Sequence, residues 1–411
     1  MTWLYLPGLY LYVICYNHAM ITLQHIQEAA GIIRSSIHRT PLIQSNSLSR
    51  MTGAEVWLKL ENLQKTGSFK VRGAFNKLSQ VSGERVVAAS MGNHGQAVAY
   101  AANRLGKKAV IVMPETAAIV KEEASRGYGA EVVREGETLS HALAAAEAMR
   151  DAVFIHPFDD DAVIAGQGTV GMEIAEDLQG IDAVFAPIGG GGLIAGLSLA
   201  VKMLSAGTAV IGVQAEAAPA GFLSRRERKI AECTPLPTIA DGIAVARIGE
   251  RTFESLSRHV DDVLLVSDDA ISRAVLLLME RKKLVVEGAG AVPLAALLEH
   301  ADRFRGKRVV LVLSGGNIDF TVVDRIIRRG LVTSGRIGML PIMVPDAPGG
   351  LHAVTGLLAS MRANILDVVH DRFAADLPFG MTRVVITAEI RGKEHLDEIR
   401  TGLMKHGYRI S

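Results

Sequence analysis

The sequence is poor in cysteine and has almost no net charge. Its 411 residues include only two cysteines, Cys15 and Cys233. They can form neither a disulfide framework nor a paired-cysteine metal motif, so we expect a reducing, cytoplasmic location. Because 44 basic residues nearly balance 43 acidic ones, nothing indicates a nucleic-acid partner. Hydrophobic residues make up 49% of the chain, which is ample for two or three globular domains.

The sequence predicts neither a membrane-spanning nor a secretory segment. The apolar run at residues 3–16 is too short to cross a bilayer and is interrupted by Pro7-Gly8. It has neither a basic leading region nor a clear cleavage site. We therefore expect residues 1–19 to be an upstream extension, with Met20 as the working start. The alternative is an arm that packs on a partner subunit.

Short β-branched runs alternate with longer amphipathic stretches through most of the chain. The runs predict strands at residues 55–60, 86–89, 109–113, 132–133, 183–188, 210–213, 263–266 and 309–313. The stretches predict helices that include residues 22–35, 95–105, 139–149 and 193–204. This alternation is typical of an α/β protein with parallel sheets covered by helices on both faces. Ligand sites are then expected at the carboxyl ends of the strands.

The last 80 residues form a different pattern after an expected linker at residues 329–336, which ends in Ser334-Gly335-Arg336. Strands are predicted at residues 339–344, 365–372, 382–390 and 408–410, and helices at 351–361 and 394–406. The order βαββαβ is that of the ferredoxin-like unit. Such a unit could fold as a module of its own.

A polar turn from Glu61 leads to Phe69-Lys70 at the start of a predicted helix. A lysine that forms a Schiff base needs surroundings that lower its pKa, so that the free amine exists near neutral pH. Phe69 would offer a flat apolar face beside it. Taken alone, the segment favours an ordinary surface turn.

Two further loops follow predicted strands and are rich in small polar residues. Ser90-Met91-Gly92-Asn93-His94 comes directly after a strand, where backbone amides at a helix start can bind an anion such as a carboxylate. The alternative is a simple capping turn. Ser314 follows the apolar run at residues 309–313, and its hydroxyl could meet a ring nitrogen or merely solvent.

Four consecutive glycines, Gly189 to Gly192, separate a strand from a helix. Glycines let backbone N–H groups approach a phosphate without a side chain in the way. The same segment also matches a dinucleotide fingerprint, with Glu216 placed as the ribose-binding acid. No Gly-Lys-Ser/Thr sequence follows, so a nucleotide-triphosphate loop is disfavoured.

In their order and spacing, these four segments resemble the fold-type-II pyridoxal-phosphate enzymes, in particular the threonine and serine dehydratases and the serine racemases. The resemblance covers about residues 20–325 and rests also on residues 164–169 and 287–291. It implies a two-lobed catalytic domain like that of tryptophan synthase β. This domain would span residues 20–328, with a smaller lobe at about 65–165.

The resemblance also implies a cofactor, a reaction and a set of roles. Lys70 would hold pyridoxal 5'-phosphate covalently. The reaction would be β-elimination of water from L-threonine, and from L-serine, to give a 2-keto acid and ammonia. Phe69 would flank the cofactor ring, Asn93 would bond its hydroxyl oxygen and Ser314 its pyridine nitrogen. The phosphate would lie on Gly189, Gly190, Gly191 and Gly192, and the substrate carboxylate on Ser90, Gly92, Asn93 and His94.

Some residues depart from the family pattern. Serine racemases have a serine acid/base at the position of Met91, and a thioether cannot carry a proton, so we expect elimination rather than racemisation. Serine racemase and serine or hydroxyaspartate dehydratase are the alternatives within the fold. Glu216 and the carbonyl of Ala220 could ligate a divalent ion, but Phe222 replaces a carboxylate, which argues against a divalent site. A monovalent cation is the open alternative.

Residues 337–411, after a linker at 329–336, resemble an ACT regulatory domain. The resemblance rests on residues 346–351 and 363–368. It implies an amino-acid effector, with isoleucine or valine expected, and a homodimer or homotetramer. The expected contacts are Gly349, Gly350, Leu351, Asn364 and Ile365. The alternative is a module that only joins subunits.

Two interpretations from other classes stay open at this point. An NAD-dependent oxidoreductase would explain the glycine fingerprint but leaves Lys70, Asn93 and Ser314 without a role. A non-catalytic amino-acid sensor would use the C-terminal module alone. The complete set of Lys70, glycine loop and Ser314 argues against such a sensor.

Overall fold

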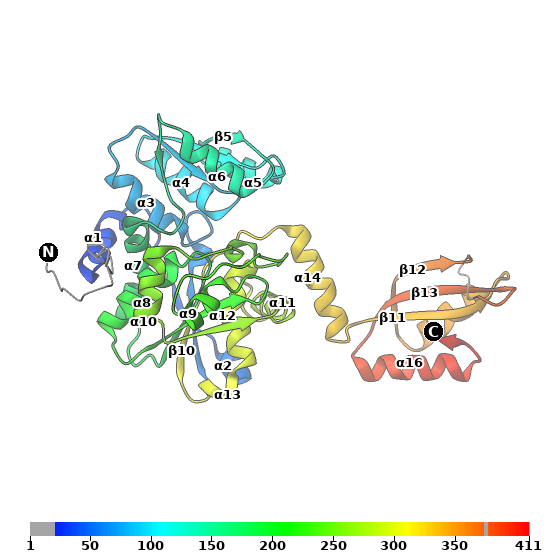
Figure 1. The fold of residues 1–411 in the computed structure, drawn as a ribbon. Helices are drawn as coiled ribbons and strands as arrows, with labels where there is room; N and C mark the ends of the chain where they lie inside the picture. The colour runs from blue at the N-terminus through cyan, green and yellow to red at the C-terminus, as the bar shows by residue number, and fades with distance from the viewer. Residues whose placement is uncertain (1–20, 374–376, 411) are drawn as a thin grey trace, which may run out of the picture.

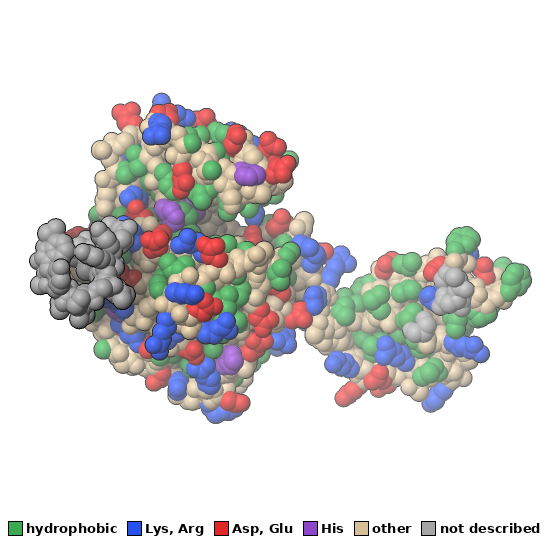
Figure 2. Space-filling model, viewed as in Figure 1, with side chains coloured by type: hydrophobic (Ala, Val, Ile, Leu, Met, Phe, Trp, Pro, Cys, Tyr) green, Lys and Arg blue, Asp and Glu red, His purple; other side chains and the backbone are tan. Residues whose placement is uncertain are grey.

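The computed structural model describes residues 21–373 and 377–410. The extension expected at residues 1–19 therefore lies outside the described residues. Within the described part, no helix is long and apolar enough to cross a membrane. Figure 2 shows acidic and basic side chains interspersed over the visible face.

The larger lobe is built on a six-stranded sheet in the order β1-β2-β10-β7-β8-β9 (Figure 1). All neighbouring pairs are parallel except β1 with β2. Its strands are β1 (Leu42–Gln44), β2 (Glu55–Leu60), β7 (Ala183–Pro187), β8 (Ala209–Ala215), β9 (Asp262–Val266) and β10 (Arg308–Leu313). Every residue of β7 is buried, because helices cover both faces of a parallel sheet.

Most helices belong to this larger lobe. They include α1 (Leu23–Ile33), α2 (Asn46–Thr52), α7 (Asp161–Asp177), α8 (Gly192–Leu204), α9 (Ala220–Glu227), α10 (Glu250–His259), α11 (Asp268–Leu277), α12 (Gly288–Glu299), α13 (Ala301–Phe304) and α14 (Phe320–Thr333). Three short turns complete it: η1 (Glu61–Leu63), η2 (Asp241–Ile243) and the π-helical η3 (Leu278–Lys282).

The smaller lobe lies above the larger one in Figure 1 and holds a parallel sheet in the order β5-β4-β3-β6. Its strands are β3 (Arg85–Ala89), β4 (Lys108–Met113), β5 (Glu131–Arg134) and β6 (Val153–Phe154). Its helices are α3 (Lys70–Gln80), α4 (Asn93–Arg104), α5 (Ile119–Gly127) and α6 (Leu139–Ala148). The predicted two-lobed α/β class is confirmed.

The C-terminal module is an antiparallel sheet in the order β12-β13-β11-β14, connected through α14 and set apart from the lobes in Figure 1. Its elements are β11 (Ile337–Pro345), α15 (Gly350–Ser360), β12 (Asn364–Asp371), β13 (Met381–Glu389), α16 (Lys393–Lys405) and β14 (Arg409–Ile410). The βαββαβ order agrees with the predicted ferredoxin-like unit. Residues 329–333, which we expected to be linker, instead form the last turns of α14.

Candidate active site

The four loops singled out from the sequence meet at one cavity. Each follows the carboxyl end of a strand or leads into a helix: residues 69–70 begin α3, residues 90–94 follow β3, residues 189–192 follow β7, and Ser314 follows β10. All line a cavity of about 1140 Å³, counted with its part open to solvent. Walls from both lobes enclose it, as parallel sheets with crossover helices predict.

Lys70 is the first residue of α3 and faces this cavity. Its Nζ donates a hydrogen bond to the carbonyl oxygen of Pro157 at 2.8 Å and lies 5.4 Å from the centre of the Phe69 ring. Its side chain is only partly covered because it faces the cavity. The protein walls nevertheless desolvate the amine, and burial lowers its pKa to about 8 against the opposing charge of Glu287. A fraction of the free amine therefore exists near neutral pH.

The glycine loop is held between packed walls. A Cβ added at Gly190 would lie 2.3 Å from the Phe158 ring, and one at Gly191 would lie 2.7 Å from Thr252. Gly191 also has a φ of 97°, which only glycine adopts readily. The loop leads into α8, whose first N–H groups have no partner within the helix. These positions accept no side chain and leave backbone donors at the cavity wall.

The loop after β3 presents the start of α4 to the same cavity. Ser90, Gly92, Asn93 and His94 all line it, with Gly92 as the residue that caps the helix. His94 Nε2 contacts the carbonyl oxygen of Ile155 at 2.9 Å, and burial with the nearby Lys70 charge lowers the pKa of this imidazole to about 3. A neutral ring engaged with a carbonyl offers no positive charge to a carboxylate. An anion would therefore rely on the helix start.

Ser314 and Phe69 are tied together by the backbone. Phe69 N–H donates to the Ser314 carbonyl at 3.0 Å, and Ser68 forms an isolated bridge with Gly315. Ser314 is 2% exposed and lines the cavity. The turn that carries Lys70 and the turn after β10 are thus held side by side at the cavity wall.

Several wall residues were not identified from the sequence. Glu287 was quoted only as part of a motif, with no role. The others gave no sequence signal, because single residues from distant loops enter the wall only through tertiary packing. These residues are Lys121, Leu139, Pro157, Phe158, Glu287 and the segment 241–245.

The residues expected to bind an effector or a metal lie elsewhere. Glu216 is exposed beyond the end of β8, and the carbonyl of Ala220 accepts a hydrogen bond from Ser224. Among the described residues, no group of three or more His, Cys, Asp or Glu side chains is placed to hold a metal ion. Gly349, Gly350 and Leu351 begin α15, while Asn364 and Ile365 begin β12, all in the C-terminal module.

The cavity fits a phosphorylated aldehyde cofactor. The amine of Lys70, with its lowered pKa, can bind an aldehyde carbon covalently. The side-chain-free loop at the start of α8 suits a phosphate. Phe69 and Ser314 supply an apolar face and a hydroxyl between them.

Comparisons with known proteins agree with this chemistry. The family model "Pyridoxal-phosphate dependent enzyme" matches residues 33–315. The L-threonine ammonia-lyase of Thermotoga maritima is 46% identical over 398 residues, which is 95% of this chain and 99% of that protein. A threonine deaminase structure from Solanum lycopersicum, the processed form of isoform 2, has a TM-score of 0.72 at 36% identity and covers 74% of this chain and 87% of its own.

A structure of maize serine racemase is also similar, with a TM-score of 0.72 at 33% identity over 77% of this chain and 99% of that chain. The match to the pyridoxal-phosphate family supports that cofactor, rather than NAD, for this chain. The family match and the similarity to an L-threonine ammonia-lyase also argue against a non-catalytic sensor. The chain belongs to the pyridoxal-phosphate dependent enzyme family.

Proposed function

We propose that this protein is an ammonia-lyase that converts L-threonine to 2-ketobutyrate and ammonia, and L-serine to pyruvate and ammonia. The observation that carries the proposal is the Lys70 amine. It has a pKa of about 8 and lines the same cavity as the glycine loop. The relatives named threonine ammonia-lyase and threonine deaminase support the choice of substrate.

Several of the cavity residues would have a part in this reaction. When bound, the cofactor supplies an electron sink for the substrate α-carbon. Lys70 would hold it, and the freed Lys70 amine would then remove the α-proton. The helix start at residues 92–94 would bind the substrate carboxylate, and Ser314 would face the pyridine nitrogen. Loss of the β-hydroxyl as water and hydrolysis of the released enamine give the keto acid and ammonia.

Met91 favours elimination over racemisation. Racemisation needs a second acid/base group on the substrate face opposite the lysine, and serine racemases place a serine at this position. Met91 lines the cavity here, and its thioether carries no transferable proton. We therefore expect pyruvate from L-serine with little D-serine.

A spectrum and a product assay test the proposal. Purified protein with added cofactor should absorb in the visible range and release 2-ketobutyrate from L-threonine. The same reaction on L-serine, analysed on a chiral column, separates pyruvate from D-serine. A colourless protein that makes no keto acid would exclude the proposed activity, and D-serine formed as fast as pyruvate would favour the racemase alternative.

The C-terminal module would regulate this activity by binding isoleucine or valine. Within one module, the two groups of expected contacts lie at opposite ends of the sheet. Pro345, just before the 349–351 turn, pairs with Met381, whereas Asn364 pairs with Glu389 at the other end of β13. Eight residues of strand separate these ends by roughly 26 Å. One small effector could touch both groups only across two modules, which supports a homodimer or homotetramer.

Adding isoleucine during the threonine assay tests the regulatory proposal. Asn364 is exposed and its Nδ2 donates to Glu389 at 3.2 Å. Asn364→Ala should leave the rate without effector unchanged and reduce any isoleucine response. An unaltered response in this variant would contradict the assignment, and no response in either protein would favour a purely structural module.

A further inference from the structure

Glu287 is a buried acid on the cavity wall for which the proposed reaction has no use. It precedes α12 as its capping residue and is 5% exposed. It lines the same cavity as Lys70. A carboxyl group is seldom buried beside a reactive amine without a partner, and its partners indicate what it does.

The carboxyl group is the end of a chain of side-chain amides. Asn93 Nδ2 donates to both Glu287 oxygens, at 2.8 and 3.0 Å. Asn93 Oδ1 in turn accepts from Asn317 Nδ2 at 2.8 Å, and the same Nδ2 reaches the Thr66 carbonyl at 2.8 Å. A donor on one side and an acceptor on the other leave the Asn93 amide a single favourable orientation.

Charged groups from three other elements face this acid. Lys70 of α3, Lys121 of α5 and Asp241 of η2 all act on it, and Lys121 pairs with Asp241 at 3.0 Å. Burial raises the pKa of Glu287 to about 7, while donation by Asn93 opposes that rise. Asp241 raises this pKa further, and the two lysines lower it. Glu287 can therefore gain or lose a proton near neutral pH.

We propose that Glu287 is a positioning residue for the reaction: its carboxylate orients the Asn93 amide at the cavity, and its protonation weakens that hold. The proposal rests on the proposed function. A carboxylate offers two acceptor oxygens to Asn93, whereas in the carboxylic acid one oxygen carries the proton and becomes a donor. The Asn93 amide then keeps a single acceptor oxygen, so it can flip its orientation more readily. The competent form is the ionised one, so activity should fall as Glu287 takes up a proton.

The first experiment is a pH profile of kcat/KM on L-threonine for the holoenzyme and for Glu287→Gln. A single ionisation gives about tenfold loss of kcat/KM per pH unit below its pKa. We expect the unaltered enzyme to show such an acid limb and Glu287→Gln to lack it. An acid limb with the same midpoint in both proteins would overturn the proposal.

Two variants at the cavity mouth provide a directional check. Asp241→Asn removes an acid that raises the pKa of Glu287, so the midpoint should move to lower pH. Lys121→Gln removes a cation that lowers it, so the midpoint should move to higher pH. Shifts in the same direction, or no shifts, would contradict a role for Glu287 in this limb. This check holds even if Glu287→Gln is poorly folded.

Unfolding of the full chain without cofactor gives a readout that does not need activity. Glu287 has a pKa of about 7 in the folded state and its ordinary pKa of 4.5 in the unfolded chain. The folded state binds more protons between these values, so this contribution to stability is lost as pH rises through that window. The difference in unfolding free energy between the unaltered protein and Glu287→Gln should change with pH there. A pH-independent difference would overturn the proposal, while absence of keto acid with a changing difference would sink only the proposed function.

Discussion

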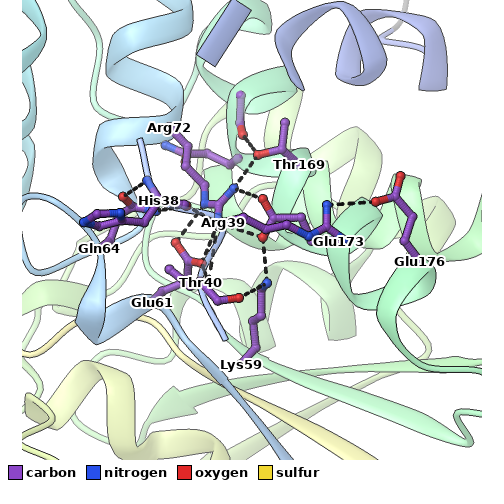
Figure 3. Close-up of polar contacts among 12 residues, drawn as sticks. His38, Arg39, Thr40, Lys59, Glu61, Gln64, Arg72, Thr169, Glu173 and Glu176 are labelled. Carbon is purple, nitrogen blue, oxygen red and sulfur yellow. Dashed lines mark hydrogen bonds and ion pairs between the residues drawn. The ribbon is translucent and has the colours of Figure 1, made fainter. Parts of the chain in front are cut away.

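Helix α3 carries two cations two residues apart whose surroundings differ completely. Lys70 faces the cavity and donates to one neutral carbonyl at 2.8 Å. Arg72 is 0% exposed and pairs with Glu61 at 2.8 Å and with Glu173 at 2.7 Å (Figure 3). A single neutral partner leaves the lysine able to lose its proton, whereas two carboxylates fix the charge of the arginine.

The charges in the cluster around Arg72 balance one another. Lys59 Nζ donates to Glu173 at 2.6 Å and to the Thr40 carbonyl at 2.7 Å, so two cations face two acids. Burial alone would lower the pKa of Arg72, but Glu61 and Glu173 raise it above its ordinary value. For Glu61, burial favours a higher pKa, yet the charge and hydrogen bonds of Arg72 hold it below the ordinary value. The cluster ties β2, η1, α3 and α7 together. Arg72 therefore has a structural role, whereas the amine of Lys70 is placed to react.

Removing the reactive cation should have the largest effect on activity. Lys70→Ala deletes the amine that would hold the cofactor and move the α-proton, and loss of the proton transfer alone costs about 10²- to 10⁴-fold in rate. Keto-acid release should become undetectable or nearly so, while urea unfolding should change little. Lys65→Ala, at an exposed lysine of the same turn, is the control. Full turnover in Lys70→Ala would refute the assignment.

Removing the structural cation, Arg72, should instead act mainly on the stability of the fold. Arg72→Met leaves Glu61 and Glu173 buried without their shared partner, which costs about 3–5 kcal/mol of unfolding free energy. Urea unfolding measures this loss, and adding Glu61→Gln should recover part of it by removing one stranded charge. Wild-type stability in Arg72→Met would show that the cluster does not hold the lobe as inferred.

The sequence predicted the reactive side of this comparison better than the structural side. The glycine loop stood out from its residues, while the family resemblance pointed to Lys70 and Ser314, and all of them line one cavity. Lys59 shows why the buried cluster could not be predicted. A polar residue in an alternating strand suggests an exposed face, yet β2 lies between β1 and β10 and Lys59 is 0% exposed. That burial is tolerable because Lys59 pairs with Glu173 on α7, 114 positions away, and donates to the Thr40 carbonyl.

As the pH is lowered, His94 in the cavity and Glu61 in the Arg72 cluster should lose their contributions to stability at different pH values. The cavity residue His94 has a folded pKa of about 3 against an ordinary 6.5. Between these values only the unfolded chain is protonated, so stability falls as pH drops below 6.5. Glu61 has a lowered pKa, so its contribution persists above 4.5 and is lost as pH falls through its folded value.

Urea unfolding at pH 7.5, 5.5 and 4 measures this order. His94→Asn should change its stability difference from the unaltered protein already between pH 7.5 and 5.5. Glu61→Gln should keep a constant difference until the pH falls below about 4.5. The opposite order would mean that the cluster, not the cavity, is the acid-sensitive part.

The smallest expected effect comes from a third cation on the same helix. Lys77 pairs with Asp160 at 2.6 Å, with side chains 24% and 21% exposed. Lys77→Met should cost less than about 1 kcal/mol, because solvent screens the pair. Asp160 keeps its bonds to the N–H groups of Ala162 and Val163 at the start of α7, so no stranded acid results. Urea unfolding of Lys77→Met beside Arg72→Met therefore separates loss of a pair from burial of an unpaired acid. A loss at Lys77 as large as the roughly 3 kcal/mol expected for a broken buried pair would mean that burial is not what distinguishes the Arg72 cluster.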